Sequence, residues 1–221
     1  IAHAAFGVVE VGLQKDELSW SRVQPFMRDA LGSSTGHVAL EAVSLVGRGI
    51  SNEFLVWPEV FEYLEEAAAD HRQPVVGMSV RAAYYAAWGP ESSFDWDETR
   101  ALLRTALQAE SDGIRTACIE TAGAAMQEQS PEWGEVKEFI DSVSVPESES
   151  GLTELIRAVA TGINQLDTRW EEVEPYLTRA LHSGRKPVAV KSVKFVKELI
   201  VEQDVDWEEI NGFLAAARTH E

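Results

Sequence analysis

Charged side chains that could bind a partner recur at a fixed interval along the chain. Arg81, Glu120, Arg157 and Lys194 are separated by 39, 37 and 37 residues. Together with their neighbours, the candidate binding residues are Arg48, Arg81, Tyr85, Glu120, Arg157, Lys191 and Lys194. Arginine and tyrosine are common anchors of protein interfaces, so this column could recognise an acidic or amphipathic peptide. The same charges could instead pair with one another, from Arg81 to Glu120 to Arg157, which would contribute little to stability at a surface.

Residues with catalytic or metal-binding potential show no comparable order. The five histidines lack the spacing of a metal site, and a single cysteine, Cys118, excludes a disulfide framework and cysteine-cluster metal sites. Cys118 lies among small residues, where a buried structural thiol is expected rather than a nucleophile. No phosphate-binding glycine loop occurs, and carboxylates are too numerous to single out an acid–base pair. We therefore expect no enzyme, no metal and no cofactor.

The charge balance restricts the partners. Asp and Glu total 37 against 19 Lys and Arg, which gives a net charge of −18. Such a chain repels polyanions, so a protein or peptide is a better partner than nucleic acid or an anionic membrane. No apolar run is long enough to cross a bilayer, no signal-peptide pattern is present, and the lone cysteine fits a cytoplasmic protein. The first residue is Ile1 rather than methionine, which favours a piece of a larger chain or complex.

An internal repeat marked by tryptophan positions the candidate residues. The marker tryptophans, separated by 37, 39, 37, 37 and 37 residues, are Trp20, Trp57, Trp96, Trp133, Trp170 and Trp207. Apolar side chains, or a threonine in one case, follow each of them at three, six, seven and ten positions, which describes one face of an α-helix. We expect a helix at each tryptophan, with the tryptophan itself in the core.

A second helix is expected about 18 residues after each tryptophan, beyond a break rich in Gly, Pro or Ser. Its aligned first residues are Val38, Val75, Ile114, Gly151 and Val188. This helix carries many small residues, and Ala117, Ala122, Gly123 and Ala124 would let neighbouring helices approach closely. The charged column falls on the non-core face of this second helix.

The repeat predicts an all-α fold, namely a right-handed α-α superhelix of about six helix-turn-helix units of 37 residues. One domain would span 1–221, with a partial repeat over 1–19, repeats starting at 20, 57, 96, 133 and 170, and a partial repeat over 207–221. The stretch Asp112-Gly113-Ile114-Arg115-Thr116-Ala117, continuing to Ala122-Gly123, resembles the second helix of a HEAT repeat. The chain as a whole resembles the HEAT/armadillo superfamily of α-solenoids.

The resemblance implies an extended binding surface. In HEAT-type proteins the first helix of each unit usually lines the convex side and the second the concave side, so the column would face a concave groove. The expected function is a non-catalytic scaffold that presents this groove to a protein or peptide. Two alternatives stay open, namely a HEAT-like nucleic-acid enzyme such as an alkylpurine DNA glycosylase and a structural segment of a multi-subunit assembly. The net charge and the lack of a dense basic track disfavour the DNA enzyme.

Overall fold

The computed structural model describes residues 2–89, 94–129, 131–144, 146–166, 169–202 and 207–218, and these residues form helices and connecting turns without a strand. The α-helices are α1 (Ala2–Gln14), α2 (Trp20–Leu31), α3 (Gly36–Ser51), α4 (Trp57–Ala68), α5 (Gln73–Ala87), α6 (Trp96–Ala106), α7 (Asp112–Gln129), α8 (Trp133–Ser142), α9 (Glu149–Leu166), α10 (Trp170–Leu181), α11 (Lys186–Glu202) and α12 (Trp207–Ala217). A short 3₁₀ turn, η1 (Leu107–Ala109), follows α6. The predicted all-α fold class is confirmed.

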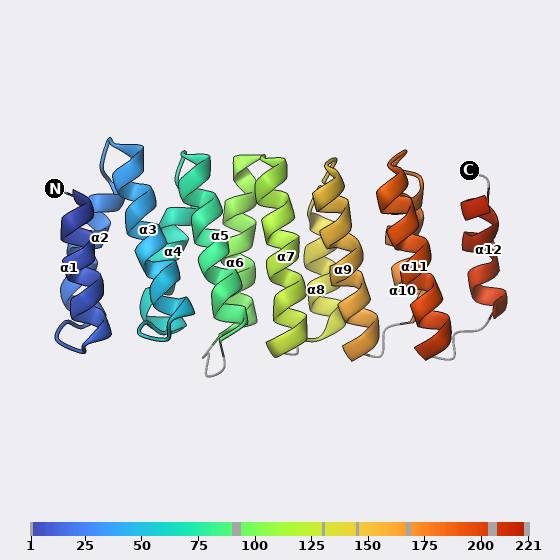
Figure 1. The fold of residues 1–221 in the computed structure, drawn as a ribbon, viewed down its shortest axis with the longest axis horizontal. Helices are drawn as coiled ribbons and strands as arrows, with labels where there is room; N and C mark the ends of the chain where they lie inside the picture. The colour runs from blue at the N-terminus through green and yellow to red at the C-terminus, as the bar shows by residue number, and fades with distance from the viewer. Residues whose placement is uncertain are drawn as a thin grey trace.

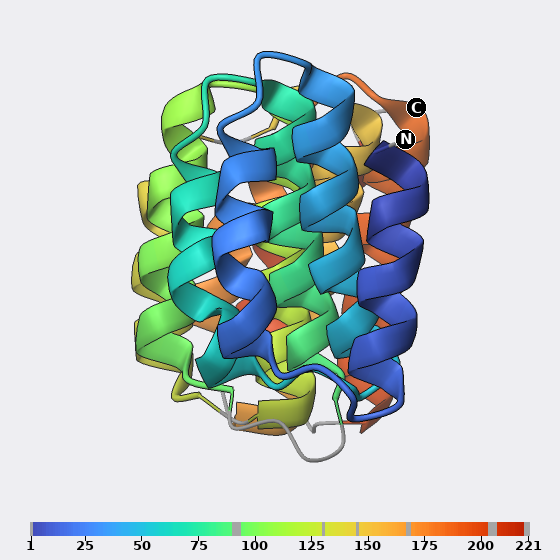
Figure 2. The ribbon, with the colours of Figure 1, turned by 90° about the vertical axis from the view of Figure 1, so that its left-hand side faces the viewer.

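Successive helices alternate between two layers. In the first layer α2 contacts α4, α4 contacts α6, and α10 contacts α12, while in the second layer contacts link α1, α3, α5, α7, α9 and α11 in chain order. Figure 1 shows the second layer as a row of helices side by side, with the two chain ends at opposite ends of the row. Figure 2 shows the two layers from the N-terminal end. The hydrophobic core lies between them.

Tryptophan begins each first-layer helix and connects it to the next. The indole of Trp20 meets the ring of Tyr63 at 5.5 Å between centroids, and Trp96 meets Phe139 and Trp170 meets Phe213 at 6.0 Å each. These pairs are edge-on, which is a favoured aromatic geometry. Five marker tryptophans are at most 9% exposed, as the sequence predicts.

The prediction of a core position is wrong for Trp207, which is 60% exposed. Each buried counterpart lies under the following first-layer helix, whereas no described helix lies beyond α12. Phe26, predicted to lie on the apolar face of α2, is 39% exposed at the other end of the row, where it still contacts Phe6. The pattern therefore marks the apolar face correctly, but burial also needs a neighbouring helix.

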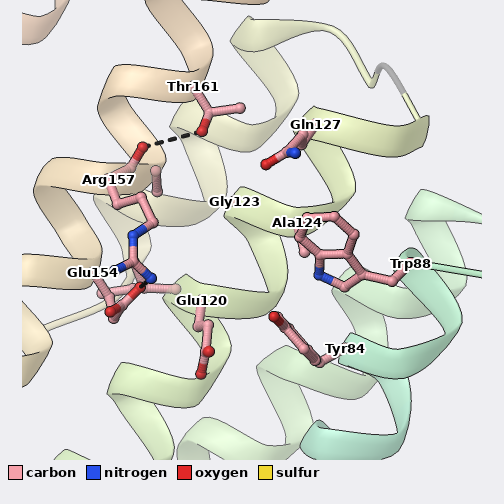
Figure 3. A pocket seen from close by; sticks show the side chains of 11 residues that line it. Tyr84, Trp88, Glu120, Gly123, Ala124, Gln127, Glu154, Arg157 and Thr161 are labelled. Carbon is pink, nitrogen blue, oxygen red and sulfur yellow. Dashed lines mark hydrogen bonds and ion pairs between the residues drawn. The ribbon is translucent and has the colours of Figure 1, made fainter. Parts of the chain in front are cut away.

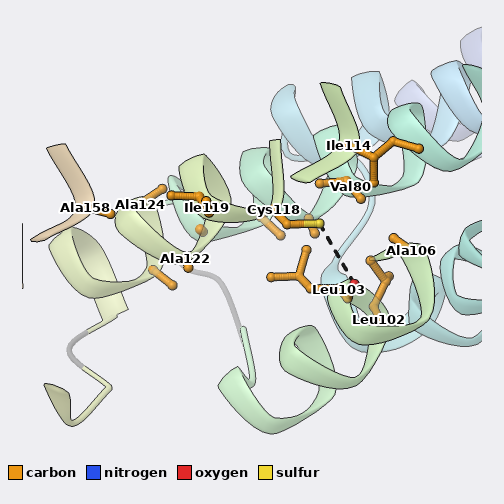
Figure 4. Close-up of a cluster of buried hydrophobic side chains, with 14 of the residues drawn as sticks. Val80, Leu102, Leu103, Ala106, Ile114, Cys118, Ile119, Ala122, Ala124 and Ala158 are labelled. Atoms are coloured by element: carbon orange, nitrogen blue, oxygen red, sulfur yellow. Dashed lines mark hydrogen bonds between the residues drawn. The ribbon is translucent and has the colours of Figure 1, made fainter. Parts of the chain in front are cut away.

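Small residues bring the second-layer helices close together. A Cβ atom added to Gly123 of α7 would lie 3.3 Å from the Cβ of Ala158 on α9, which is a tight contact. On the opposite face of α7, Cys118 is fully buried, and its thiol approaches the carbonyl of Leu103 at 3.9 Å (Figure 4). Burial raises the pKa of this thiol, so it stays protonated at neutral pH. The predicted structural role of Cys118 agrees with this environment.

Arg72 fastens the end of α2 to the turn before α5. Its guanidinium donates to the backbone carbonyls of Ser33 and Leu31 at 2.7 Å each, and its Nε donates to Asp70 at 2.8 Å. These bonds satisfy carbonyls at the end of α2 that have no partner within the helix. Since hydrogen bonds to a charged group contribute about 1.5–3 kcal/mol, Arg72→Ala should lower the free energy of unfolding by about that amount in urea titrations.

The same contact predicts a pH dependence. The hydrogen bond from Arg72 holds the pKa of Asp70 below its ordinary value. A lowered folded-state pKa contributes stability that is complete above the unfolded pKa of about 3.9 and is lost as the pH falls through the folded value. The stability difference between the wild type and Asp70→Asn should therefore be largest at pH 7 and shrink below about pH 4. An equal difference at pH 7 and at pH 3 would contradict this assignment.

Candidate protein-binding surface

An aromatic–arginine cluster lies on the exposed face of α5 and consists of Arg81, Tyr84, Tyr85 and Trp88. The guanidinium carbon of Arg81 lies 5.2 Å from the ring centre of Tyr84 and 5.4 Å from that of Tyr85, within range of cation–π contacts. Its Nε also donates to the Tyr85 hydroxyl at 3.3 Å. Tyr84 in turn neighbours Trp88, with 6.2 Å between ring centres. Trp88 is 43% exposed, so the cluster presents a large apolar ring to solvent.

The local sequence explains this placement. Residues 81, 84, 85 and 88 are spaced so that they follow one stripe of a helix, while the alanines at positions 82, 83, 86 and 87 are buried against the neighbouring helices. The buried alanines keep α5 close to α3 and α7, which leaves the bulky side chains on the opposite face. Trp88 is the one tryptophan outside the 37-residue interval, and that irregularity is the sequence signal for its different role.

A small pocket of about 50 Å³ opens beside the cluster, between α5, α7 and α9. Its floor includes Gly123 and Ala124, with Tyr84 and Trp88 on the α5 side and Arg157 on the α9 side (Figure 3). Pockets for drug-sized molecules usually measure about 300–1,000 Å³, so this one fits the end of a single side chain rather than a whole ligand. The surface is therefore suited to a macromolecular partner.

The predicted ladder from Arg81 to Glu120 to Arg157 is only partly present. Arg81 Nη1 lies 3.9 Å from Glu120 Oε2, across the α5–α7 contact. Arg157, however, pairs at 2.8 Å with Glu154, three residues earlier on its own helix. Pairs spaced by three or four residues on one helix form without any adjustment between helices. Arg81, Tyr85, Glu120 and Arg157 are thus gathered around the cluster and its pocket.

Glu154 is the most confined carboxylate of this pocket, because its side chain is only 16% exposed. Burial raises its pKa, and the nearby Glu120 carboxylate adds to the rise, while Arg157 and Lys191 act in the opposite direction. The arginines around the pocket are therefore matched by carboxylates at short range. A partner with many negative charges gains little from this part of the surface.

The remaining candidate residues lie elsewhere. Arg48 on α3 binds Glu10 of α1 in a bidentate pair at 3.0 Å and also approaches Glu41 at 3.5 Å. These contacts raise the pKa of Arg48 and tie α1 to α3, so Arg48 has a structural role at this interface. Lys191 donates to Thr153 on α9 at 3.3 Å. Lys194 lies in a separate groove formed with α10 and α12.

Catalytic groups and membrane spans were sought in the same described ranges. They contain no group of three or more His, Cys, Asp or Glu side chains arranged to hold a metal ion. No described helix combines the length and the apolarity needed to cross a bilayer. In comparisons with known proteins, no family model, curated protein or solved structure matches the chain. The functional inference consequently depends on the geometry of the surface.

Proposed function

We propose that the chain is a non-catalytic protein-binding scaffold of the HEAT type, a right-handed superhelix of about six units whose second-layer helices form a concave binding groove. The regular helix starts support this repeat. First-layer helices begin at the marker tryptophans, and second-layer helices begin at residues 36, 73, 112, 149 and 186, which are again 37 or 39 residues apart. An array of such units buries a continuous core and leaves a long surface for a partner.

The exposed aromatic–arginine cluster is the observation that carries the proposal. Trp, Tyr and Arg are the residues that most often dominate binding energy in protein interfaces. Five marker tryptophans are at most 9% exposed, whereas Trp88 leaves 43% of its surface in water although it lies in the middle of the array. Covering its ring with a partner would remove apolar surface from water. The adjacent pocket then accepts one side chain of that partner.

The pairing of arginines with carboxylates disfavours the alternative of a nucleic-acid enzyme. Affinity for DNA depends on cations that remain free to neutralise phosphates. Around the pocket Arg81 and Arg157 each have a carboxylate partner, and the chain carries a net charge of −18. The surface therefore combines apolar anchors with balanced charge, as expected for protein recognition.

The test compares two double variants in partner capture from native lysate. Arg81→Ala with Trp88→Ala removes the cluster, and we expect it to reduce recovery of specific partners by roughly tenfold or more. Arg104→Ala with Glu138→Ala breaks an exposed pair of 3.1 Å in the first layer and serves as the matched control, which should retain the partners. Circular dichroism checks that both variants fold.

Two results would contradict the proposal. One is equal recovery by the cluster variant and the wild type. The other is tight binding of duplex DNA in a filter assay with a steep dependence on salt, because such a slope reports contacts to many phosphates.

A further inference from the structure

Positive charge in this acidic protein is concentrated on α11. Residues 185–197 contain Arg185, Lys186, Lys191, Lys194 and Lys197 and no acidic residue, so this stretch carries a charge of +5 in a chain of −18. Four of the six lysines of the chain lie on this one helix. Glu198 is the first acid that follows, one turn beyond Lys194. The surface of α11 therefore differs in sign from most of the molecule.

The lysines differ from the arginines in their contacts. Arg48, Arg81 and Arg157 each have a carboxylate within 4 Å. Lys191 reaches toward α9, where it donates to Thr153. Within the described ranges, by contrast, no carboxylate lies within ion-pairing distance of Lys186, Lys194 or Lys197. These three ammonium groups are thus available to an external carboxylate.

An apolar groove of about 480 Å³ lies between two of these lysines. Leu181 of α10, Ala189, Val190 and Val193 of α11 and Ala217 of α12 line it, together with Lys186 and Lys194. Val190 is 43% exposed. The positions 186, 190, 194 and 197 follow one stripe of the helix, since they are spaced by four, four and three residues. Cations therefore flank an apolar strip along a single face of α11.

We propose that this groove docks an acidic amphipathic helix of a partner protein, with apolar side chains over Val190 and Val193 and carboxylates facing Lys186 and Lys194. The inference rests on the scaffold function proposed above and specifies the chemistry of the partner at a second part of the same layer. A helix with an apolar face fits a groove through residues spaced by three and four positions. The unpaired lysines select acidic flanks and steer the approach of the partner.

Charge distinguishes this occupant from others. A second copy of the chain also carries −18, so two copies repel each other at long range. A nucleic acid would meet the lysines but would leave the apolar strip between them uncovered. A basic helix would place like charges beside Lys186 and Lys194, which is unfavourable. Only an acidic amphipathic helix uses both the cations and the apolar strip.

The experiment uses three fluorescent 18-residue peptides and the full chain. The first is an amphipathic helix with a leucine stripe flanked by glutamates, the second carries lysines in place of the glutamates, and the third keeps the glutamates but replaces the leucines by serines. Fluorescence anisotropy should detect binding of the first peptide alone. Its affinity should fall several-fold between 50 and 500 mM NaCl, because the Debye length shortens from above 10 Å to below 8 Å.

Matched charge variants separate local contacts from the overall charge. Lys186→Glu with Lys194→Glu should weaken the first peptide by roughly tenfold or more. Lys15→Glu with Arg22→Glu changes the total charge by the same amount on exposed sites of the N-terminal end and should leave the affinity nearly unchanged. Equal weakening by both double variants, or equal binding of all three peptides, would overturn the inference.

Two further readings complete the design. Sedimentation of the chain at increasing concentration would overturn the inference if it showed self-association that Lys186→Glu with Lys194→Glu abolishes, because the face would then bind a second copy. If the acidic peptide fails to bind while partner capture still depends on Arg81 and Trp88, the docking site on α11 is wrong and the scaffold function stands. Loss of that capture dependence alone would have the opposite meaning.

Discussion

Replacing Trp57 by alanine is expected to lower the free energy of unfolding by about 3–5 kcal/mol, the usual cost of removing a buried large aromatic side chain. Trp57 is 1% exposed, and its ring lies 5.6 Å from Phe61 and 5.9 Å from Phe94 between centroids. Its indole N–H also donates to Glu98 at 3.1 Å, across the contact between α4 and α6. The substitution removes both the packing and this link between neighbouring first-layer helices.

Trp207→Ala provides the matched control, because Trp207 occupies the same position of the interval but is 60% exposed. Its replacement should change the free energy of unfolding by less than about 1 kcal/mol, as is usual for an exposed side chain. Urea titrations followed by far-UV circular dichroism measure both values. Similar losses for the two variants would show that the interval alone, rather than cover by the following helix, determines the contribution of each tryptophan.

The helices of the first layer could be predicted from the sequence almost to the residue. A bulky tryptophan followed by apolar side chains at helical spacing marks both the start and the buried face, and α2, α4 and α6 begin at their tryptophans. Second-layer helices begin two residues before the predicted positions, for example at Gly36 rather than Val38. Periodicity locates the first buried side chain, while the helix extends further into exposed residues that carry no apolar signal.

Side-chain partners could be predicted less well than helices. Glu120 and Glu154 were both candidates to bind Arg157, and the choice of Glu154 depends on side-chain geometry within α9 rather than on repeat spacing. Arg48 resembles Arg81 in chemistry, yet Glu10 and Glu41 occupy it at the α1–α3 contact. A spacing rule can place these residues on one face, but long flexible side chains choose among several carboxylates within reach.

The aromatic part of the surface escaped the pattern for a different reason. Repeat positions report what the units share, whereas a binding site depends on what one unit has and the others lack. Trp88 and Tyr84 belong to α5 alone, and their exposure follows from the buried alanines on the other side of that helix. A tryptophan outside the regular interval is therefore the sequence feature that best identifies the candidate surface.

The two proposed contact regions follow from different balances of the same layer. Between α5 and α9 the cations are paired and the exposed groups are aromatic, so binding there depends on apolar contact and shape. On α11 the lysines are without a carboxylate neighbour in the described structure and flank an apolar strip, so binding there depends on charge as well. High salt should consequently weaken a contact at α11 more than one at Trp88.

Gly123→Leu is expected to destabilise the protein by about 1–3 kcal/mol, the usual cost of placing a larger side chain in a filled space. The added Cβ would lie 3.3 Å from the Cβ and 3.4 Å from the Cα of Ala158, so α7 and α9 must move apart. Since Gly123 also lines the pocket beside Trp88, the same change should abolish partner capture that depends on the cluster.

Gly77→Leu on α5 is the control, because no atom lies within 4 Å of a Cβ added there. Leucine forms helix more readily than glycine, so this variant should be more stable than the wild type by up to about 1 kcal/mol. The two variants make the same chemical change in neighbouring helices of one layer, and urea titrations should give shifts of opposite sign. If Gly123→Leu also stabilised the protein, the close approach of α7 and α9 would be wrong, and with it the depth of the pocket on which the proposed site depends.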